Sequence, residues 1–293
     1  MITHSHPLGL TDWTRMTTLK YDEIGYWSEI KLDIVKEYAQ AYSTIMSAQK
    51  FIQKHIYIDA FAGAGHHISK VTKEFVKGSP LNALLIRPPF SEFHLIDLDG
   101  KRTDELRRVV GNRSSVEFYK EDANDVLLNK VFPRCKYTDF RRALCLLDPY
   151  SFSVDWKVIE MAGQMKSIEI FFNFMIMDIN MNVLLRNPER VPESQIQRMD
   201  KSWGDHSWRE IAYEKVPTLF GDSEMKTSNE TIAEAFRQRL HKVAGFKFVP
   251  QPIPMRNEQG STVYYLYFAS PNETGANIVT SIFKKYKDRG RIR

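Results

Sequence analysis

The nine residues Tyr57–Gly65, YIDAFAGAG, decide the fold. In this stretch an apolar run that can form a buried strand leads into the pattern D-x-F-x-G-x-G, which consists of Asp59, Phe61, Gly63 and Gly65. Because glycine has no Cβ, such a turn can adopt positive φ and bring its backbone amides against a ligand. We therefore expect a ligand just beyond the end of this strand. A glycine turn with a purely structural role remains an alternative.

Short apolar runs alternate with helical patterns after this turn, which predicts an α/β fold. The runs are almost continuously apolar, as expected for strands of a parallel sheet that helices cover on both faces. Right-handed crossovers would connect neighbouring strands. The expected strands are residues 56–61, 93–97, 116–120, 143–148 and 168–174, and the expected helices between them are 79–85, 101–110, 123–131 and 153–165.

The chain is expected to form one core with a leading segment and an insertion. Residues 27–54 carry apolar side chains at helical spacing, which predicts an amphipathic helix before the core. After residue 174 the alternation stops, and a polar, aromatic and proline-containing sequence predicts a helical insertion that could recognise a substrate. The three parts are the leading segment 1–54, the core formed by 55–174 and 229–293, and the insertion 175–228.

The last part of the core is expected to close the sheet. A helix over 230–243 precedes two strand candidates, 246–255 and 263–270, and a final helix covers 277–286. A short turn at 257–261 would join the two strands into an antiparallel hairpin at one edge of the sheet.

Acidic residues follow the next three predicted strands. Asp97 is placed where a carboxylate can accept hydrogen bonds from the hydroxyls of a ribose, whereas Asp99 is expected to cap the following helix. Asp122 could accept a hydrogen bond from an adenine amino group or cap a helix. Asp148 could orient or deprotonate a nucleophile, or cap the helix after Ser153. Since the carboxyl ends of parallel strands share one edge, these residues should converge with the glycines on one crevice.

The order of these motifs resembles the class I S-adenosylmethionine-dependent methyltransferases. More narrowly, the segments IKLDIVKEYAQAY, YIDAFAGAG, GSPLNAL, HLIDLD and LLDPYSFSVDW resemble the three-Cys-motif partner family over roughly residues 27–174, and YYLYFAS extends the match. The resemblance implies a Rossmann-like class I methyltransferase fold, with a mostly parallel seven-stranded sheet, a C-terminal antiparallel hairpin and a helical insertion. It also implies a companion protein that carries three cysteines.

The resemblance further assigns residues to S-adenosyl-L-methionine and to its methyl acceptor. The methionine end takes Asp59, Gly63 and Gly65, the ribose takes Asp97, and the adenine takes Asp122. Phe61 is also assigned to the cofactor-binding residues. Asp148, Pro149 and Tyr150 fall where amino methyltransferases hold their target. There a carboxylate and a backbone carbonyl accept hydrogen bonds from an exocyclic amine, and an aromatic ring stacks on a flipped base. The D-P-Y sequence has one proline where the amino-methylating enzymes have two.

These observations predict an S-adenosylmethionine-dependent methyltransferase that acts on nucleic acid. One alternative is a methyltransferase for a protein, such as the three-cysteine companion, or for a small molecule. Another is a regulatory module that binds the cofactor without catalysis. A nicotinamide oxidoreductase is disfavoured, because Phe61 occupies the position of the first glycine of the dinucleotide fingerprint.

The charge of the chain is mildly basic, with a net charge of +5 and an isoelectric point near 9.0. This balance favours polyanionic partners without identifying one. The run 284–293 contains six Lys or Arg residues against one Asp, and a solvated terminal tail is its simplest interpretation. The insertion combines rings with cations that could bind bases and phosphates or pack in a core, namely Trp203, Trp208, Tyr213, Arg198, Lys201 and Arg209.

A cytoplasmic protein without a membrane partner is expected. No stretch approaches the roughly 20 uninterrupted apolar residues that a bilayer span requires, and the N-terminus lacks the charge and apolar order of a signal peptide. Cys135 and Cys145 allow at most one disulfide, and Cys145 lies in an apolar run typical of a buried thiol. No metal site is predicted, because the adjacent imidazoles of His66 and His67 cannot easily face one ion.

Overall fold

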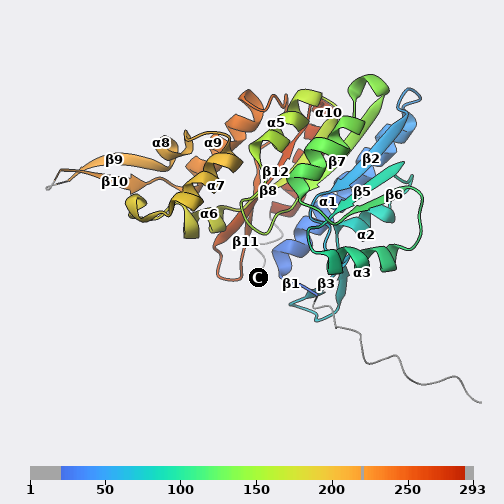
Figure 1. The fold of residues 1–293 in the computed structure, drawn as a ribbon, viewed down its shortest axis with the longest axis horizontal. Coiled ribbons are helices and arrows are strands. Elements are labelled where there is room, and N and C mark those ends of the chain that lie inside the picture. Colours follow the sequence, from blue (N-terminus) through green and yellow to red (C-terminus); the bar gives the residue numbers. More distant parts are fainter. Residues whose placement is uncertain (1–20, 219–220, 288–293) are drawn as a thin grey trace, which may run out of the picture.

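A seven-stranded sheet forms the centre of the protein in a computed structural model that describes residues 21–218 and 221–287 (Figure 1). The strands follow the order β11-β12-β8-β7-β2-β5-β6. They are β2 (Lys54–Asp59), β5 (Glu92–Ile96), β6 (Val116–Tyr119), β7 (Arg141–Leu147), β8 (Ile168–Phe174), β11 (Ile253–Arg256) and β12 (Thr262–Ala269). The pairs among β2, β5, β6, β7 and β8 are parallel, whereas β12 is antiparallel to both β8 and β11. The expected mostly parallel sheet with a closing antiparallel hairpin is confirmed.

Helices cover both faces of this sheet and bury two separate apolar cores. Successive residues of a strand face opposite sides, so Leu144 packs in one core and Cys145 in the other. This is why the central strands are apolar along their whole length. One face carries α1 (Tyr26–Ala48), α2 (Ser79–Leu84), α3 (Gly100–Val110) and α10 (Glu273–Lys287), and the other carries α4 (Ala123–Val126), α5 (Trp156–Met165) and α9 (Asn229–Lys242).

The insertion contains a hairpin that the expectation of a helical segment omitted. Its helices are α6 (Ile176–Asn182), α7 (Glu193–Trp203) and α8 (Trp208–Ala212), and its strands are β9 (Tyr213–Thr218) and β10 (Gly221–Lys226). The hairpin extends from one end of the molecule (Figure 1). Pro217 disfavours a helix in this segment, because proline lacks an amide hydrogen and clashes with the preceding turn.

The segment expected as a strand over 246–255 pairs only in its last part. Strand β11 begins at Ile253, and before it Phe248 makes an isolated bridge to Ser270. Pro250, Pro252 and Pro254 alternate along this segment, and none of them can donate a backbone hydrogen bond to a neighbouring strand. The prolines therefore shorten the edge strand.

A further small sheet lies beside the glycine turn and was not expected. It contains β1 (Glu23–Ile24), β3 (His66–Ser69) and β4 (Phe75–Lys77), with β3 in the middle. Strand β1 pairs with β3 although about forty residues separate them in the sequence. His66 and His67 thus belong to a strand, and the segment before α1 is held close to the turn after β2.

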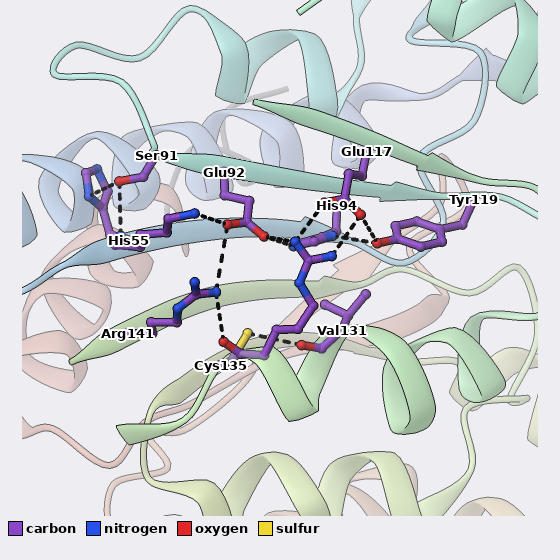
Figure 2. Close-up of polar contacts among 11 residues, drawn as sticks. His55, Ser91, Glu92, His94, Glu117, Tyr119, Val131, Cys135 and Arg141 are labelled. Carbon is purple, nitrogen blue, oxygen red and sulfur yellow. Dashed lines mark hydrogen bonds and ion pairs between the residues drawn. The ribbon is translucent and has the colours of Figure 1, made fainter. Parts of the chain in front are cut away.

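An ionic network connects the first halves of β5 and β6 (Figure 2). Glu92, His94 and Glu117 offer ligand atoms within 4.8 Å of one another, a spacing that a cation could use. The guanidinium of Arg134 already bridges the two carboxylates, at 2.6 Å from Glu92 and 2.7 Å from Glu117. Lys54 adds a second positive charge at 2.9 Å from Glu92. The protein itself thus supplies the positive charge here.

A buried carboxyl group links α1 to the sheet. The hydroxyls of Tyr38 and Ser270 donate to the two oxygens of Glu169 on β8, and the Glu169–Ser270 distance is 2.8 Å. Burial raises the pKa of Glu169 to about 7, although both hydrogen bonds oppose the shift. The folded protein therefore keeps a proton on Glu169 at pH values where the unfolded chain has lost it.

We expect this proton to make stability depend on pH. Between the ordinary pKa of Glu169, 4.5, and its raised value of about 7, the native state binds more protons than the unfolded state, so the free energy of unfolding falls as pH rises. Glu169→Gln cannot ionise, so its fall should be shallower than that of the wild-type protein. Urea denaturation from roughly pH 5 to pH 8 measures both curves. Parallel curves would show that the proton does not contribute.

Within the described ranges 21–218 and 221–287, no helix has the length and apolar character that crossing a membrane requires.

Candidate functional site

A cavity of about 420 Å³ lies at the carboxyl edge of the parallel strands. Phe61 and Gly63 line it from the turn after β2, and Asp148, Pro149 and Tyr150 line it from the segment after β7. The rest of its wall comes from the segment before α1, from α1 itself, and from the small sheet, β8 and β12. The glycine turn and the D-P-Y segment therefore share one cavity.

The two glycines of the turn have different surroundings. Both have positive φ, +62° at Gly63 and +86° at Gly65. A Cβ built on Gly63 would meet nothing within 4 Å, whereas one on Gly65 would lie 2.8 Å from Cδ1 of Leu106 on α3. Gly63 thus leaves open space beside the cavity, while the small size of Gly65 allows close packing of α3.

Asp59 supports the turn from inside the protein and does not line the cavity. Its carboxylate accepts hydrogen bonds from the Tyr57 hydroxyl at 3.3 Å and the Phe61 amide at 3.4 Å. Burial raises its pKa to about 7, and a hydrogen bond from the Ser79 hydroxyl opposes the shift. Its assignment to the methionine end of a cofactor stays a prediction, since the structure shows a bracing role.

Asp97 connects the second parallel strand to the glycine turn. Its Oδ2 accepts from the Gly63 amide at 2.9 Å, and its Oδ1 accepts from the Asp99 amide at 2.8 Å. Asp97 is buried next to the cavity without lining it. Carboxylate oxygens accept more than one hydrogen bond, so these contacts leave acceptor capacity for a ribose.

Two other acidic residues cap helices. The carboxylate of Asp99 accepts from the Lys101 amide at 2.8 Å at the start of α3, which confirms the cap expected there. Asp122 accepts from the Asn124 amide at 2.9 Å at the start of α4 and does not line the cavity. The cap alternative for Asp122 is therefore observed, and its contact with adenine stays a prediction.

Asp148 forms a partly buried ion pair in the wall of the cavity. Lys31 of α1 donates to its Oδ2, and Nδ2 of Asn173 on β8 donates to its Oδ1. Burial alone would lower the pKa of Lys31, but the Asp148 carboxylate raises it above its usual value, so Lys31 stays charged. The alternative that Asp148 caps α5 is wrong, because Asp155 occupies that N-cap position.

Lys31 and Asn173 are site residues that the sequence analysis missed. Lys31 lies in line with the buried residues Val35 and Tyr38 of α1, where an amphipathic helix would be expected to carry an apolar side chain. Asn173 is a polar residue in a strand whose seven positions are all buried. A charged or amide side chain on a buried face was the available signal, because such groups need a partner.

Tyr150 is held in place by the segment before α1. Its side chain is 65% exposed, and its hydroxyl donates to Oδ2 of Asp22 at 2.6 Å. Arg102 of α3 contacts the Tyr150 hydroxyl and pairs with Asp22 at 2.9 Å. The ring thus lies at the rim of the cavity, in contact with two elements far apart in sequence.

The insertion braces the segment that follows Tyr150. Asp178 on α6 accepts from the Phe152 amide at 2.9 Å, and Arg198 on α7 pairs with Asp178 at 2.6 Å. Arg198 also donates to the Phe152 carbonyl at 3.3 Å. The insertion therefore holds the backbone that directly follows the D-P-Y segment.

The tryptophans of the insertion pack in the core, and Lys201 and Arg209 form ion pairs within the protein. Trp203 and Trp208 are buried, which confirms the alternative that these aromatic residues pack inside the protein. Lys201 pairs with Asp155 at 3.0 Å, and Arg209 pairs with a carboxylate of β10. Of the basic C-terminal run, Lys284, Lys285 and Lys287 belong to α10, and residues 288–293 lie outside the described residues.

Comparisons with known proteins show similarity only among solved structures. No family model matches the chain, and no curated protein matches it. A protein from Legionella pneumophila str. Philadelphia 1 is similar over 88% of this chain and 93% of its own, with a TM-score of 0.50 and 10% identity. An S-adenosylmethionine dependent methyltransferase from Mesorhizobium loti covers 78% of this chain and 97% of its own, with a TM-score of 0.36 and 11% identity. A protein described as such a methyltransferase from Listeria monocytogenes covers 82% and 99%, with a TM-score of 0.41 and 13% identity.

The chain has the class I methyltransferase fold, a Rossmann-like α/β architecture. In order of sequence, the strands of the sheet are arranged 6-7-5-4-1-2-3, with the seventh antiparallel to its neighbours and the glycine turn after the first. The Legionella pneumophila structure is similar in overall fold over most of both chains.

The contact between Asp97 and the glycine turn can be tested against the neighbouring helix cap. Asp97→Ala leaves the amides of Gly63 and Asp99 without their acceptor, and should lower the free energy of unfolding by about 2–3 kcal/mol. Asp99→Ala removes only a cap and should lower it by about 1 kcal/mol. Urea denaturation of both variants measures the difference. Equal losses would show that Asp97 does not hold the turn.

Proposed function

We propose that the protein is an S-adenosylmethionine-dependent methyltransferase that transfers the methyl group to a nitrogen of a nucleic-acid base. The observation that carries this proposal is the cavity that joins the turn at Gly63 to Asp148 on a class I methyltransferase fold. In this fold class, ligands bind outside the carboxyl ends of the parallel strands. The cavity lies at that edge.

The residues around the cavity fit this cofactor. The open space beside Gly63 allows a ligand to approach the backbone, and Nδ1 of His67 is buried near this turn without a hydrogen-bond partner among the described residues. Lys31 provides a cation for the carboxylate of the methionine end, and Asp97 provides acceptors for the ribose hydroxyls. S-Adenosylmethionine would supply a methyl group bonded to a positively charged sulfur.

The protein has to align a nucleophile with that methyl group and accept one proton. Asp148 lines the cavity on the segment after β7, and Lys31 and Asn173 fix its orientation. The oxygens of Asp148 have acceptor capacity beyond their bonds to Lys31 and Asn173, so the side chain can accept an N–H hydrogen bond. The exposed ring of Tyr150 lies at the rim, where it can stack on a planar acceptor.

A nucleic-acid acceptor is supported by the exposed Tyr150 ring and by the net charge of +5. The insertion adds little to this support, because its tryptophans are buried. By the resemblance of its motifs, the chain would also act beside a companion protein with three cysteines. Its cytoplasmic location is supported by Cys135 and Cys145, which are both buried free thiols.

S-Adenosylhomocysteine should bind to the wild-type protein in a calorimetric titration. Asp148→Asn should keep that binding within about threefold but lower methyl transfer to unmodified RNA or DNA about a hundredfold or more, because it removes the proton acceptor. Transfer is measured with methyl-labelled cofactor. Label found in protein or in small molecules, and not in nucleic acid, would favour a methyltransferase that acts on those substrates.

Asp104→Asn is the matched control for this experiment. Asp104 is an exposed carboxylate of α3 that pairs with Lys120 and does not line the cavity. Its substitution should leave both binding and transfer unchanged. Wild-type transfer rates in Asp148→Asn would remove Asp148 from the mechanism.

The role of Lys31 can be separated from the rest of the cofactor site. Lys31→Met should weaken S-adenosylhomocysteine binding about tenfold or more, because the methionine carboxylate loses its cation. It should leave the affinity for 5′-methylthioadenosine unchanged, since that molecule has no carboxylate. Calorimetry with both ligands measures the two effects. A parallel loss for both ligands would mean that Lys31 supports the fold of the site and does not bind the carboxylate.

A further inference from the structure

Asn173 lines the cavity and carries an acceptor atom that has no hydrogen-bond partner among the described residues. The residue lies near the end of β8, beside the end of β7, and only 1% of it is exposed. It lines the cavity together with Asp148. Its Nδ2 donates to Oδ1 of Asp148, whereas its own Oδ1 has no hydrogen-bond partner among the described residues.

The orientation of this amide is fixed by its neighbour. Rotating the side chain to exchange its two ends would place Oδ1 against the carboxylate of Asp148, and two acceptors repel each other. The amide oxygen is therefore kept free while the amide nitrogen is used. Buried carbonyl groups in folded proteins are nearly always paired, so an unpaired one in the wall of a cavity is a candidate acceptor for a donor of the ligand.

We propose that Asn173 positions the methyl acceptor by accepting one of its N–H groups, and that the site thereby selects a primary amino group. This inference rests on the methyl transfer proposed above. Asp148 has acceptor capacity beyond its bonds to Lys31 and Asn173, so it takes the second N–H. Two neighbouring acceptors match the two hydrogens of an –NH2 group. A hydroxyl or a secondary amine has only one hydrogen to offer.

The reaction balances with this arrangement. The nitrogen lone pair forms a bond to the methyl carbon, and the carbon–sulfur bond breaks with its electron pair remaining on sulfur. Sulfur becomes neutral, and nitrogen gains the positive charge until it loses one proton to Asp148, which passes it to water. The product carries one N–H and one methyl group. It can no longer satisfy both acceptors, so the site favours a single methylation.

The test compares acceptors with two N–H groups and with one. The probes are RNA and DNA made with ordinary adenine and cytosine nucleotides, and the same molecules made with N6-methyladenine and N4-methylcytosine nucleotides. Methyl transfer is followed with labelled cofactor, and mass spectrometry of the nucleosides identifies the methylated atom. The wild-type protein should methylate the unmodified probes at least about tenfold better than the methylated ones.

Two variants of Asn173 separate positioning of the acceptor from support of Asp148. Asn173→Leu keeps the approximate volume and removes both polar atoms, so it should lose most of the preference for the primary amine along with activity. Asn173→Asp loses the donor to Asp148 but keeps an acceptor oxygen, so its activity should fall while the preference remains. A purely structural role predicts that both variants keep the wild-type preference. The Asp variant also provides the test if the Leu variant fails to fold.

The matched control is Asn180→Leu. Asn180 on α6 bonds to Asn229 and accepts from Lys226, and it does not line the cavity. This variant should match the wild-type protein in rate and in preference. Binding of S-adenosylhomocysteine should be unchanged in all three variants, and a loss confined to the Asn173 variants would assign Asn173 to the cofactor and overturn the proposal.

The remaining outcomes separate this inference from the proposed function. Methylation of an oxygen, carbon or sulfur atom would leave the methyltransferase in place and overturn the primary amine. Equal rates on the two kinds of probe would also overturn it. If the wild-type protein neither binds S-adenosylhomocysteine nor methylates any probe, the proposed function fails and the inference fails with it.

Discussion

The ion pair between Lys31 and Asp148 is the contact on which the site depends. It joins a helix that precedes the sheet to the end of a central strand, and its charged atoms are largely removed from water. In a partly buried pair of this kind, each side chain compensates the charge of the other and so orients it. Asn173 supplies the third member and orients the carboxylate from the neighbouring strand. These three residues thus bring α1 and the ends of β7 and β8 together at the cavity.

The glycine turn and Asp148 are held in a fixed relation by elements that do not touch the cavity. Asp59 and Asp97 accept amide hydrogen bonds from the turn after β2. Asp178 and Arg198 hold the backbone just after the D-P-Y segment. Because carboxylates bonded to backbone amides are strong and directional acceptors, these contacts limit the movement of both walls. Ionisable side chains that do not line the cavity therefore hold the backbone segments that do.

Much of the fold could be predicted from the sequence because its signals are local. Continuous apolar runs predicted the central strands, and the pattern D-x-F-x-G-x-G from Asp59 to Gly65 predicted the turn at their carboxyl edge. The helix cap at Asp99 followed from its position alone. The short strand β1 could not be predicted, since two residues carry no periodicity and it pairs with a strand distant in the sequence. The shortening of β11 was present in its alternating prolines, which outweigh an apolar pattern.

The candidate site divides in the same way. Gly63 and Asp148 line the cavity and belong to motifs. They could be predicted because each follows the end of a parallel strand. Lys31 and Asn173 were not, because their importance depends on what faces them across the fold. A lone Lys on an amphipathic helix ordinarily extends to water, and only the packing of α1 against the sheet turns it inward.

The walls of the cavity come from both ends and from the middle of the described chain. Residues from Asp22 before α1 to Tyr264 on β12 contribute to it, so no contiguous half of the protein contains a complete binding site. A ligand held there would interact only with the fully assembled fold, and its binding free energy would add to the stability of the whole molecule. During synthesis such a ligand could not assist the early strands. It would lock the structure only after the last strand had joined the sheet.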